Sequence, residues 1–123
     1  MRTRVLQEKN YAERMQNGVE PYLAAHAEEF YWERESGHPI HVLRYRAFRP
    51  RVVVISHGFT ENAEKYKEIV YYFIKEHFHV YLPEHCGHGK SYRLVDDPSL
   101  VYVDSYHRYV EDLLFVARKA KAE

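Results

Sequence analysis

Residues 52–59 read VVVISHGF, and this stretch decides the fold. Its β-branched run, Val52–Ile55, is typical of a strand that is buried on both faces of a parallel sheet. A helical stripe of apolar residues follows between Asn62 and His77, and a second short apolar run covers Phe78–Leu82. Strand, helix and strand in this order predict a βαβ unit.

Two helices are predicted near the start of the chain. The stretch Thr3–Gly18 favours helix, and Asn10 and Glu13 have the spacing of a capping box. Gly18 stands where a helix would stop, and Pro21 suits the first turn of a short second helix that ends near His26.

The rest of the chain predicts a hairpin before the βαβ unit and a helix after it. Residues 29–35 and 40–48 flank a turn cluster, which indicates an antiparallel hairpin. A last helix is expected to begin near Asp104. Its apolar residues are expected to share one face; they are Tyr106, Val110, Leu113, Leu114 and Ala117. The predicted class is therefore α/β: an antiparallel N-terminal hairpin plus a βαβ unit of a mixed sheet with flanking helices.

Composition narrows the class of protein. The 123 residues are 46% hydrophobic, which is enough for one domain or part of one. Lys and Arg number 18, as do Asp and Glu, so a generic basic nucleic-acid binder is not expected. No apolar run approaches the ~20 residues of a membrane helix, and the N-terminus lacks a secretory apolar region. With Cys86 as the single cysteine, a cytoplasmic protein without an internal disulfide is expected.

Two loops follow the predicted parallel strands, where open α/β sheets place their binding sites. The first contains His57 and Gly58, and the second, residues 84–91, reads EHCGHGKS. A glycine after a buried strand lets a backbone N–H turn toward a bound oxygen, and two such donors form an oxyanion hole. On its own, the His-Gly pair is more often a plain tight turn.

Taken together, the two loops carry a resemblance to a known family. A strand, HGFTE at 57–61, a helix, a strand and GHGKS at 87–91 resemble the first half of α/β-hydrolases of the lysophospholipase and monoacylglycerol lipase type, also grouped as serine aminopeptidase-like hydrolases. The resemblance implies an incomplete α/β-hydrolase fold, with 1–123 as the N-terminal portion of a single domain. Residues 1–27 would form N-terminal helices, and 28–123 the start of the sheet and its first two flanking helices.

The resemblance also implies roles for residues in both loops. Phe59, which follows His57 and Gly58, would give its backbone N–H to the oxyanion hole. The second loop would shape the pocket floor and hold the backbone through Gly87, His88, Gly89 and Ser91. Glu84 stands where the family usually has aspartate and Cys86 where it usually has arginine, so the buried ion pair that this loop normally makes is in question.

The family's nucleophile lies in a G-x-S-x-G elbow on a strand after the last predicted helix. No serine of this chain has glycine on both sides; the serines are Ser36, Ser56, Ser91, Ser99 and Ser105. The 123 residues are therefore expected to hold one oxyanion donor, no triad member and no activity by themselves. By resemblance the intact protein would be a serine hydrolase that cleaves small-molecule carboxylic esters, with lysophospholipids or monoacylglycerols as substrates and without a metal or organic cofactor.

Rival sites use the same loops. Ser56 with His57, or Ser91 with His88, could form an improvised triad. Neighbours on a strand end point in opposite directions, which disfavours the first pair, and the second pair has no obvious third group. A metal site or a thiol nucleophile would draw on His85, Cys86 and His88. Scattered loop histidines are the simpler interpretation.

The predicted central strand also suggests partners. In the resembled fold, Val52–Ile55 has a neighbouring strand on each side, and one of them is the nucleophile strand. If the chain ends at Glu123, this strand becomes an open edge, and aggregation, self-association or pairing with a C-terminal half is expected. A non-catalytic relic or interaction module that uses this edge is the alternative function.

Overall fold

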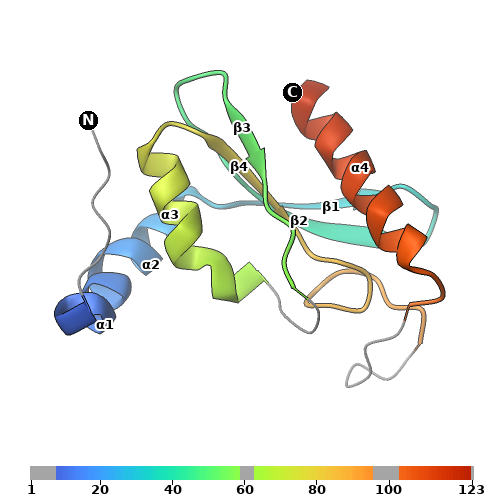
Figure 1. Ribbon diagram of the computed structural model, residues 1–123, viewed down its shortest axis with the longest axis horizontal. Coiled ribbons are helices and arrows are strands. Elements are labelled where there is room, and N and C mark those ends of the chain that lie inside the picture. The colour runs from blue at the N-terminus through green and yellow to red at the C-terminus, as the bar shows by residue number, and fades with distance from the viewer. Residues whose placement is uncertain (1–7, 59–62, 96–102, 123) are drawn as a thin grey trace.

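A computed structural model describes residues 8–58, 63–95 and 103–122 (Figure 1). The described strands form one mixed sheet in the order β1-β2-β4-β3. Their bounds are β1 Glu28–Glu33, β2 Pro39–Tyr45, β3 Val52–Val54 and β4 His79–Pro83. β2 runs antiparallel to β1 and to β4, whereas β3 and β4 are parallel. The predicted antiparallel hairpin and βαβ unit are therefore confirmed.

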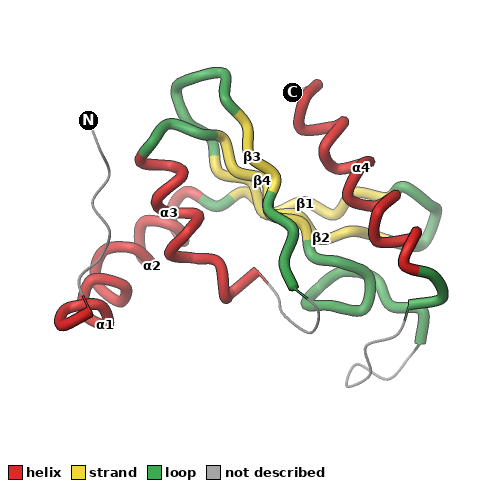
Figure 2. The backbone as a smooth tube through the Cα atoms, in the orientation of Figure 1, coloured by secondary structure: helices red, strands yellow, loops and turns green. Residues whose placement is uncertain are grey.

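Helices cover both faces of this sheet (Figure 2). α2 (Glu20–His26) and α3 (Lys67–Lys75) pack on one face, and α4 (Tyr106–Ala122) packs on the other. α3 is preceded by a 3₁₀ turn, η3 (Ala63–Tyr66). This arrangement gives three layers, with the sheet in the middle (Figure 1).

The sheet separates two hydrophobic cores because successive side chains of a strand point to opposite faces. Val80 and Leu82 of β4 face the first core, whereas Tyr81 between them faces the second. The first core is completed by Val19, Leu23, Tyr45, Val70 and Ile74. The second is completed by Ile40, Val42, Cys86, Tyr92, Val116 and Ala120.

The N-terminal helices differ from the prediction. Four segments follow one another without a break: η1 (Glu8–Asn10), α1 (Tyr11–Arg14), the π-helical η2 (Met15–Val19) and α2. Gly18 does not stop a helix, because the wider π turn continues through it into α2. Asn10 occupies the N-cap of α1 but makes no side-chain capping bond, whereas Pro21 does lie in the first turn of α2 as predicted. No helix in the described part of the chain is long and apolar enough to cross a membrane.

β3 is less buried than the β-branched run predicts. It lies at the end of the described strand order and pairs with β4 alone. As a result, Val52 is 43% exposed and Val53 and Val54 are only partly buried. The expectation of burial on both faces is therefore wrong for the described residues, because only one side of the strand has a neighbour.

α4 turns a different face to the sheet from the one predicted. Asp112, Val116 and Ala120 are buried, whereas Tyr106, Val110 and Leu114 are exposed. The apolar periodicity therefore predicted the wrong face, because the buried face also carries the charged residue Asp112.

The buried carboxylate of Asp112 is the polar anchor of α4. It accepts a hydrogen bond from the hydroxyl of Tyr92 at 2.6 Å and another from the Nε–H of Arg34 at 2.8 Å. Arg34 lies just after β1, and Tyr92 follows the loop after β4. These bonds hold α4 against both segments.

Asp112→Asn tests this anchor. The amide keeps one acceptor but presents N–H groups to a donor, so we expect the free energy of unfolding in urea to fall by roughly 3 kcal/mol. Glu111→Gln is the matched control, because Glu111 binds the same Arg34 from an exposed position. It should change stability by less than about 0.5 kcal/mol. Equal small effects in both variants would contradict the anchoring role.

Candidate functional site

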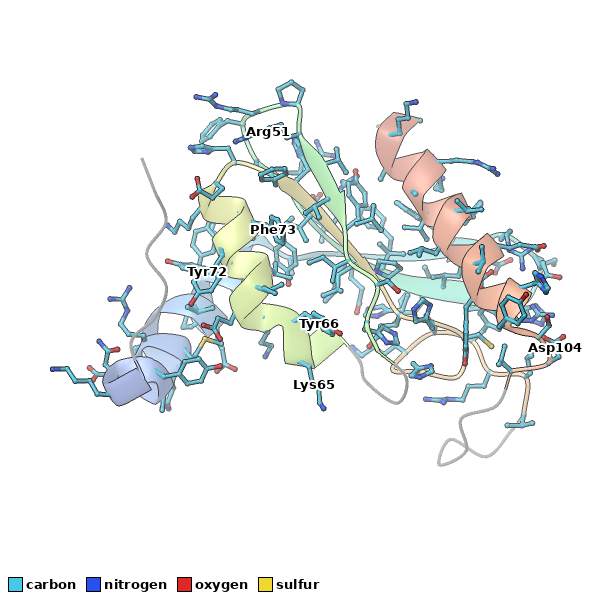
Figure 3. The ribbon with its side chains drawn as sticks, viewed as in Figure 1. Arg51, Lys65, Tyr66, Tyr72, Phe73 and Asp104 are labelled. Atoms are coloured by element: carbon cyan, nitrogen blue, oxygen red, sulfur yellow. The ribbon has the colours of Figure 1, made fainter. Side chains whose placement is uncertain are left out.

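Two loops meet where the parallel strands β3 and β4 end. We call residues 55–58 the His57 loop and residues 84–91 the Gly87 loop. Because the strands are parallel and adjacent, their carboxyl ends lie at the same edge of the sheet. In Figure 3, Tyr66 lies at this end of the molecule, and Arg51 lies at the opposite end.

His57 connects the two loops. Its side chain is buried, with 4% of the residue exposed. Nδ1 lies 2.8 Å from the carbonyl oxygen of Gly58, and Nε2 accepts the backbone N–H of His85 at 2.8 Å. These partners require a neutral ring with the proton on Nδ1. One imidazole therefore ties the backbone of the His57 loop to that of the Gly87 loop.

Gly58 directs its backbone N–H toward η3, the 3₁₀ turn before α3. The N–H donates to the hydroxyl of Tyr66, at 3.1 Å. This bond fixes the peptide between His57 and Gly58, whereas the carbonyl group of Gly58 is fixed by Nδ1 of His57. Phe59, the predicted oxyanion donor, lies outside the described residues.

The Gly87 loop is held by a buried ion pair that the prediction left in question. The carboxylate of Glu84 accepts Nδ1 of His41, from β2, at 2.6 Å and the backbone N–H of Lys90 at 2.9 Å. Nε2 of His41 lies 2.7 Å from Glu29. Burial opposes the protonation of His41, but the two carboxylates outweigh it and raise its pKa. Because both ring nitrogens face carboxylate oxygens, the contacts fit a doubly protonated His41 as the partner of Glu84, although Cys86 replaces the usual arginine.

Further bonds tie the same loop to β2. The Ser91 hydroxyl accepts the backbone N–H of His41 at 2.8 Å and donates to the carbonyl oxygen of Glu84. Gly89 has a φ of +51°, and a Cβ there would lie 1.9 Å from Oε2 of Glu84. Only glycine fits at this position, so the buried carboxylate and the loop backbone depend on each other.

Cys86 and His88 are packed into the interior. Cys86 is fully buried in the second core, and burial raises the pKa of its thiol. His88 directs Nδ1 at the carbonyl oxygen of Cys86, 2.9 Å away, and its ring lies 4.9 Å from that of His57. A buried thiol is a poor nucleophile. Among the described residues, no three His, Cys, Asp or Glu side chains are grouped to hold a metal ion.

The structure also makes a contact that the sequence did not predict. The Ser56 hydroxyl lies 3.0 Å from Nε2 of His85. Burial, together with the neighbouring rings of His57 and His88, lowers the pKa of His85 to about 4. The strand register, Val54 opposite Tyr81, brings these loop residues together, and no sequence signal states that register.

This serine–histidine pair lacks parts that nucleophilic catalysis needs. A histidine with so low a pKa is a weak general base at neutral pH. No carboxylate among the described residues hydrogen-bonds the ring of His85, so nothing in that part of the chain completes a triad. The improvised pairs of the prediction do not form either, because His57 binds Gly58 and Ser91 binds Glu84.

Comparisons with known proteins agree on one family. The family model described as serine aminopeptidase, S33, matches residues 49–123. Lysophospholipase L2 of Escherichia coli strain K12 is 41% identical over 76 residues, which cover 61% of this chain and 22% of that protein. "Probable lysophospholipase L2" of Haemophilus influenzae is 27% identical over 82 residues, which cover 67% of this chain and 26% of the relative. The chain therefore spans about a quarter or less of these relatives' length.

One solved structure supports the fold. A thioesterase domain from the curacin biosynthetic pathway superposes with a TM-score of 0.61 at 23% identity. The superposition covers 76% of this chain and 33% of that domain. The likeness concerns the arrangement of the mixed sheet and its flanking helices.

Gly89→Ala tests the close contact with Glu84. The new Cβ must displace a carboxylate that is held by His41, and we expect the free energy of unfolding to fall by about 3 kcal/mol. Gly37→Ala is the matched control, because Gly37 also has a positive φ, +81°, but open space around it. It should lose about 1 kcal/mol. Similar losses in both variants would show that backbone strain, and not the contact with Glu84, causes the loss of stability.

The depressed pKa of His85 predicts a pH dependence of stability. The unfolded chain takes up this proton near pH 6.5, whereas the folded chain takes it up only near pH 4. The contribution to stability is therefore complete above pH 6.5 and is lost as the pH falls toward 4. The difference corresponds to roughly 3 kcal/mol. The free energy of unfolding in urea is measured between about pH 7.5 and about pH 4.5, a range that includes most of the interval between the two pKa values. As the pH falls, this free energy should decrease less for His85→Gln than for the wild type. Parallel curves would contradict the assignment.

Proposed function

The chain belongs to the serine aminopeptidase, S33, family of α/β-hydrolases, and we propose that it carries the N-terminal portion of an enzyme that hydrolyses carboxylic esters of lysophospholipids or monoacylglycerols. The support is family membership together with 41% identity to a protein named lysophospholipase L2. Because the match covers 22% of that relative, the activity of the whole protein is part of the proposal.

The observation that carries the proposal is the bridge made by His57. This buried imidazole joins the two loops at the carboxyl ends of β3 and β4. An oxyanion hole needs backbone N–H groups that are held in place before the reaction, because reorganising them would weaken the stabilisation of the developing charge. The bridge supports the backbone just before Phe59 in this way.

We assign the chemistry as acyl transfer. A serine outside these 123 residues, in a G-x-S-x-G elbow, attacks the ester carbonyl carbon, and the electron pair of the C=O bond moves to the oxygen. The backbone N–H of Phe59 and a second donor from outside the described chain stabilise this oxyanion. A histidine that also lies outside these 123 residues takes the proton of the attacking serine. When the tetrahedral intermediate collapses, the ester C–O bond breaks and the alcohol leaves with that proton. Water then attacks the acyl-enzyme and gives a proton to the histidine, which returns it to the serine oxygen as the acid leaves.

The remaining loop residues have a supporting role in this proposal. Gly87, His88, Gly89 and Ser91 shape the floor of the pocket, and their bonds to β2 and to each other favour a rigid floor. The proposal requires no metal or organic cofactor. Ser56 and Cys86 are not assigned as nucleophiles because of the weak base beside one and the burial of the other.

The exposed edge of β3 is proposed as the place where the rest of the fold pairs. β3 has one described neighbour, and Val52 is 43% exposed. A further strand would satisfy its backbone groups and cover this residue. In this proposal residues 1–123 are the first part of a single domain. The same exposure favours the alternative, a non-catalytic module that pairs through this edge with a second copy. The predicted cytoplasmic location stays a prediction.

A complementation experiment tests the hydrolase proposal. The 123-residue chain is mixed with the C-terminal part of a lysophospholipase L2 relative, and hydrolysis of a p-nitrophenyl ester is measured. We expect activity only in the mixture, with a fluorophosphonate labelling the added part. Phe59→Pro removes the backbone N–H and should lower kcat about 100-fold or more. Phe59→Leu is the matched control, because it keeps that N–H.

The outcomes separate the candidate functions. Equal kcat for the proline and leucine variants would contradict the role of Phe59, provided both bind the added part equally. Activity in the chain alone that Ser56→Ala abolishes would contradict the external nucleophile. No activity in the mixture, with dimers formed by the chain alone, would favour the non-catalytic module.

A further inference from the structure

The end of the sheet opposite the His57 loop carries an exposed aromatic side chain among cations. The connection between β2 and β3 includes residues 46–51, which read RAFRPR. It lies at the top of the molecule in Figure 1, close to the C-terminal end of α4. We call this connection and the last turn of α4 the basic end.

Phe48 is the most exposed large hydrophobic residue of the described chain. It is 94% exposed, and its ring lies 6.1 Å from that of His77 between centroids. Single exposed apolar residues are common, but most of them keep part of their surface against the protein. A phenylalanine that contributes almost nothing to the core is available for an external apolar phase.

The cations around Phe48 are only partly neutralised. Arg46 pairs with Glu28 at 3.2 Å, and Arg51 stacks on Phe78 and donates to the carbonyl oxygen of Glu76. Arg49 and Lys121 have no ion-pair partner among the described residues. The chain as a whole has a net charge of zero, so this concentration of cations is a local feature.

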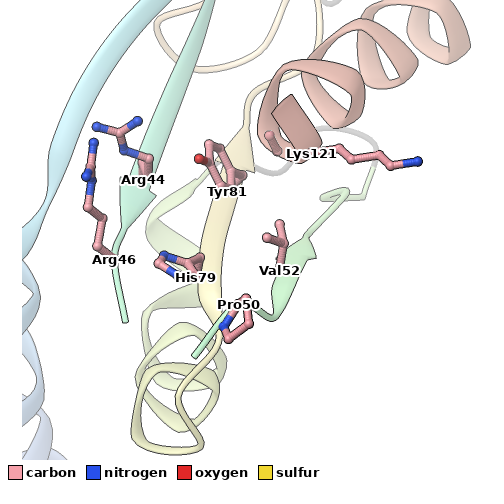
Figure 4. A pocket seen from close by; sticks show the side chains of 8 residues that line it. Arg44, Arg46, Pro50, Val52, His79, Tyr81 and Lys121 are labelled. Carbon is pink, nitrogen blue, oxygen red and sulfur yellow. The ribbon is translucent and has the colours of Figure 1, made fainter. Parts of the chain in front are cut away.

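A cavity of about 290 Å³ opens at the same end. Its lining includes Arg44, Arg46, His79, Tyr81 and Lys121 (Figure 4). The sources of these side chains are β2, the loop after it, β4 and α4. Glu28, from outside the lining, shares its single charge between Arg44 and Arg46. Lys121 adds a charge that has no ion-pair partner among the described residues. The cavity offers space and positive charge for an anionic head group.

We propose that the basic end docks on a membrane surface rich in anionic phospholipid. Phe48 enters the boundary between head groups and acyl chains, while Arg49, Arg46 and Lys121 remain at the level of the phosphates. An apolar tip between cations matches a lipid interface, whereas double-stranded nucleic acid would engage the cations through its phosphates and leave Phe48 in water. This inference goes beyond the proposed hydrolysis.

Vesicle sedimentation with the 123-residue chain tests the docking. The vesicles contain phosphatidylcholine alone or phosphatidylcholine mixed with phosphatidylglycerol. We expect binding to the mixed vesicles only, and weaker binding as salt screens the charges. Arg49→Gln and Lys121→Gln should each reduce the partition coefficient about fivefold. Phe48→Ala should reduce it about tenfold.

Matched controls use residues of the same type away from the basic end. Tyr106→Ala removes an aromatic ring that is 68% exposed at the other end of α4, and Arg14→Gln removes an exposed cation of α1. Both variants should bind as the wild type does. All variants replace exposed side chains, and circular dichroism should show an unchanged fold.

Four results would overturn the proposal. One is equal binding to neutral and anionic vesicles, or no binding to either. Another is an equal loss of binding in the Tyr106 and Arg14 controls. The third is release from the vesicles by soluble glycerol phosphate with no effect of Phe48→Ala, which would indicate a site for free phosphate esters. The fourth is release from the vesicles by single-stranded DNA, whose bases stack on aromatic side chains, which would assign the basic end to nucleic acid.

Discussion

The buried carboxylate of Glu84 is the interaction on which the candidate site depends. A carboxylate away from water needs partners, and here it has an imidazole from β2 and a backbone N–H of its own loop. The pair anchors the Gly87 loop to the sheet and leaves no room for a side chain at Gly89. That anchored loop in turn supplies the N–H of His85 that orients His57. The positions of both loops at the carboxyl ends of the parallel strands therefore depend on the carboxylate of Glu84.

The strands and the order of the elements could be predicted from the sequence, because hydrophobic periodicity reports secondary structure directly. The polar contacts could not. His41 and Glu84 are 43 positions apart, and nothing in their local sequence pairs them. The orientation of α4 was predicted wrongly for the same reason. The buried face carries Asp112, whose bonds to Arg34 and Tyr92 join residues that are distant in the sequence. The exposure of β3 depends on how many strands surround it, which local sequence does not state. The roles expected for Phe59 and for the Gly87 loop came from the resemblance to the hydrolase family. The spacing of the residues did not indicate these roles by itself.

The two ends of the parallel strands have opposite electrostatic character. At the carboxyl ends, burial keeps His85 neutral, and His57 is a neutral hydrogen-bonding bridge. At the amino ends, arginine and lysine side chains surround an exposed phenylalanine and an open cavity. The sheet holds these surfaces apart, so a substrate and an anionic surface could be engaged without competing for the same residues.

The contact between Arg34 and Asp112 spans 78 positions of the chain. During synthesis, the turn that carries Arg34 leaves the ribosome long before the helix that carries its partner. At 5–20 residues per second this interval is roughly 4 to 16 seconds. The face of the sheet that packs on α2 and α3 can be covered within it, whereas the face that awaits α4 stays open to water. The nascent protein thus passes through a stage with one finished core and one exposed apolar surface, on which a chaperone would act.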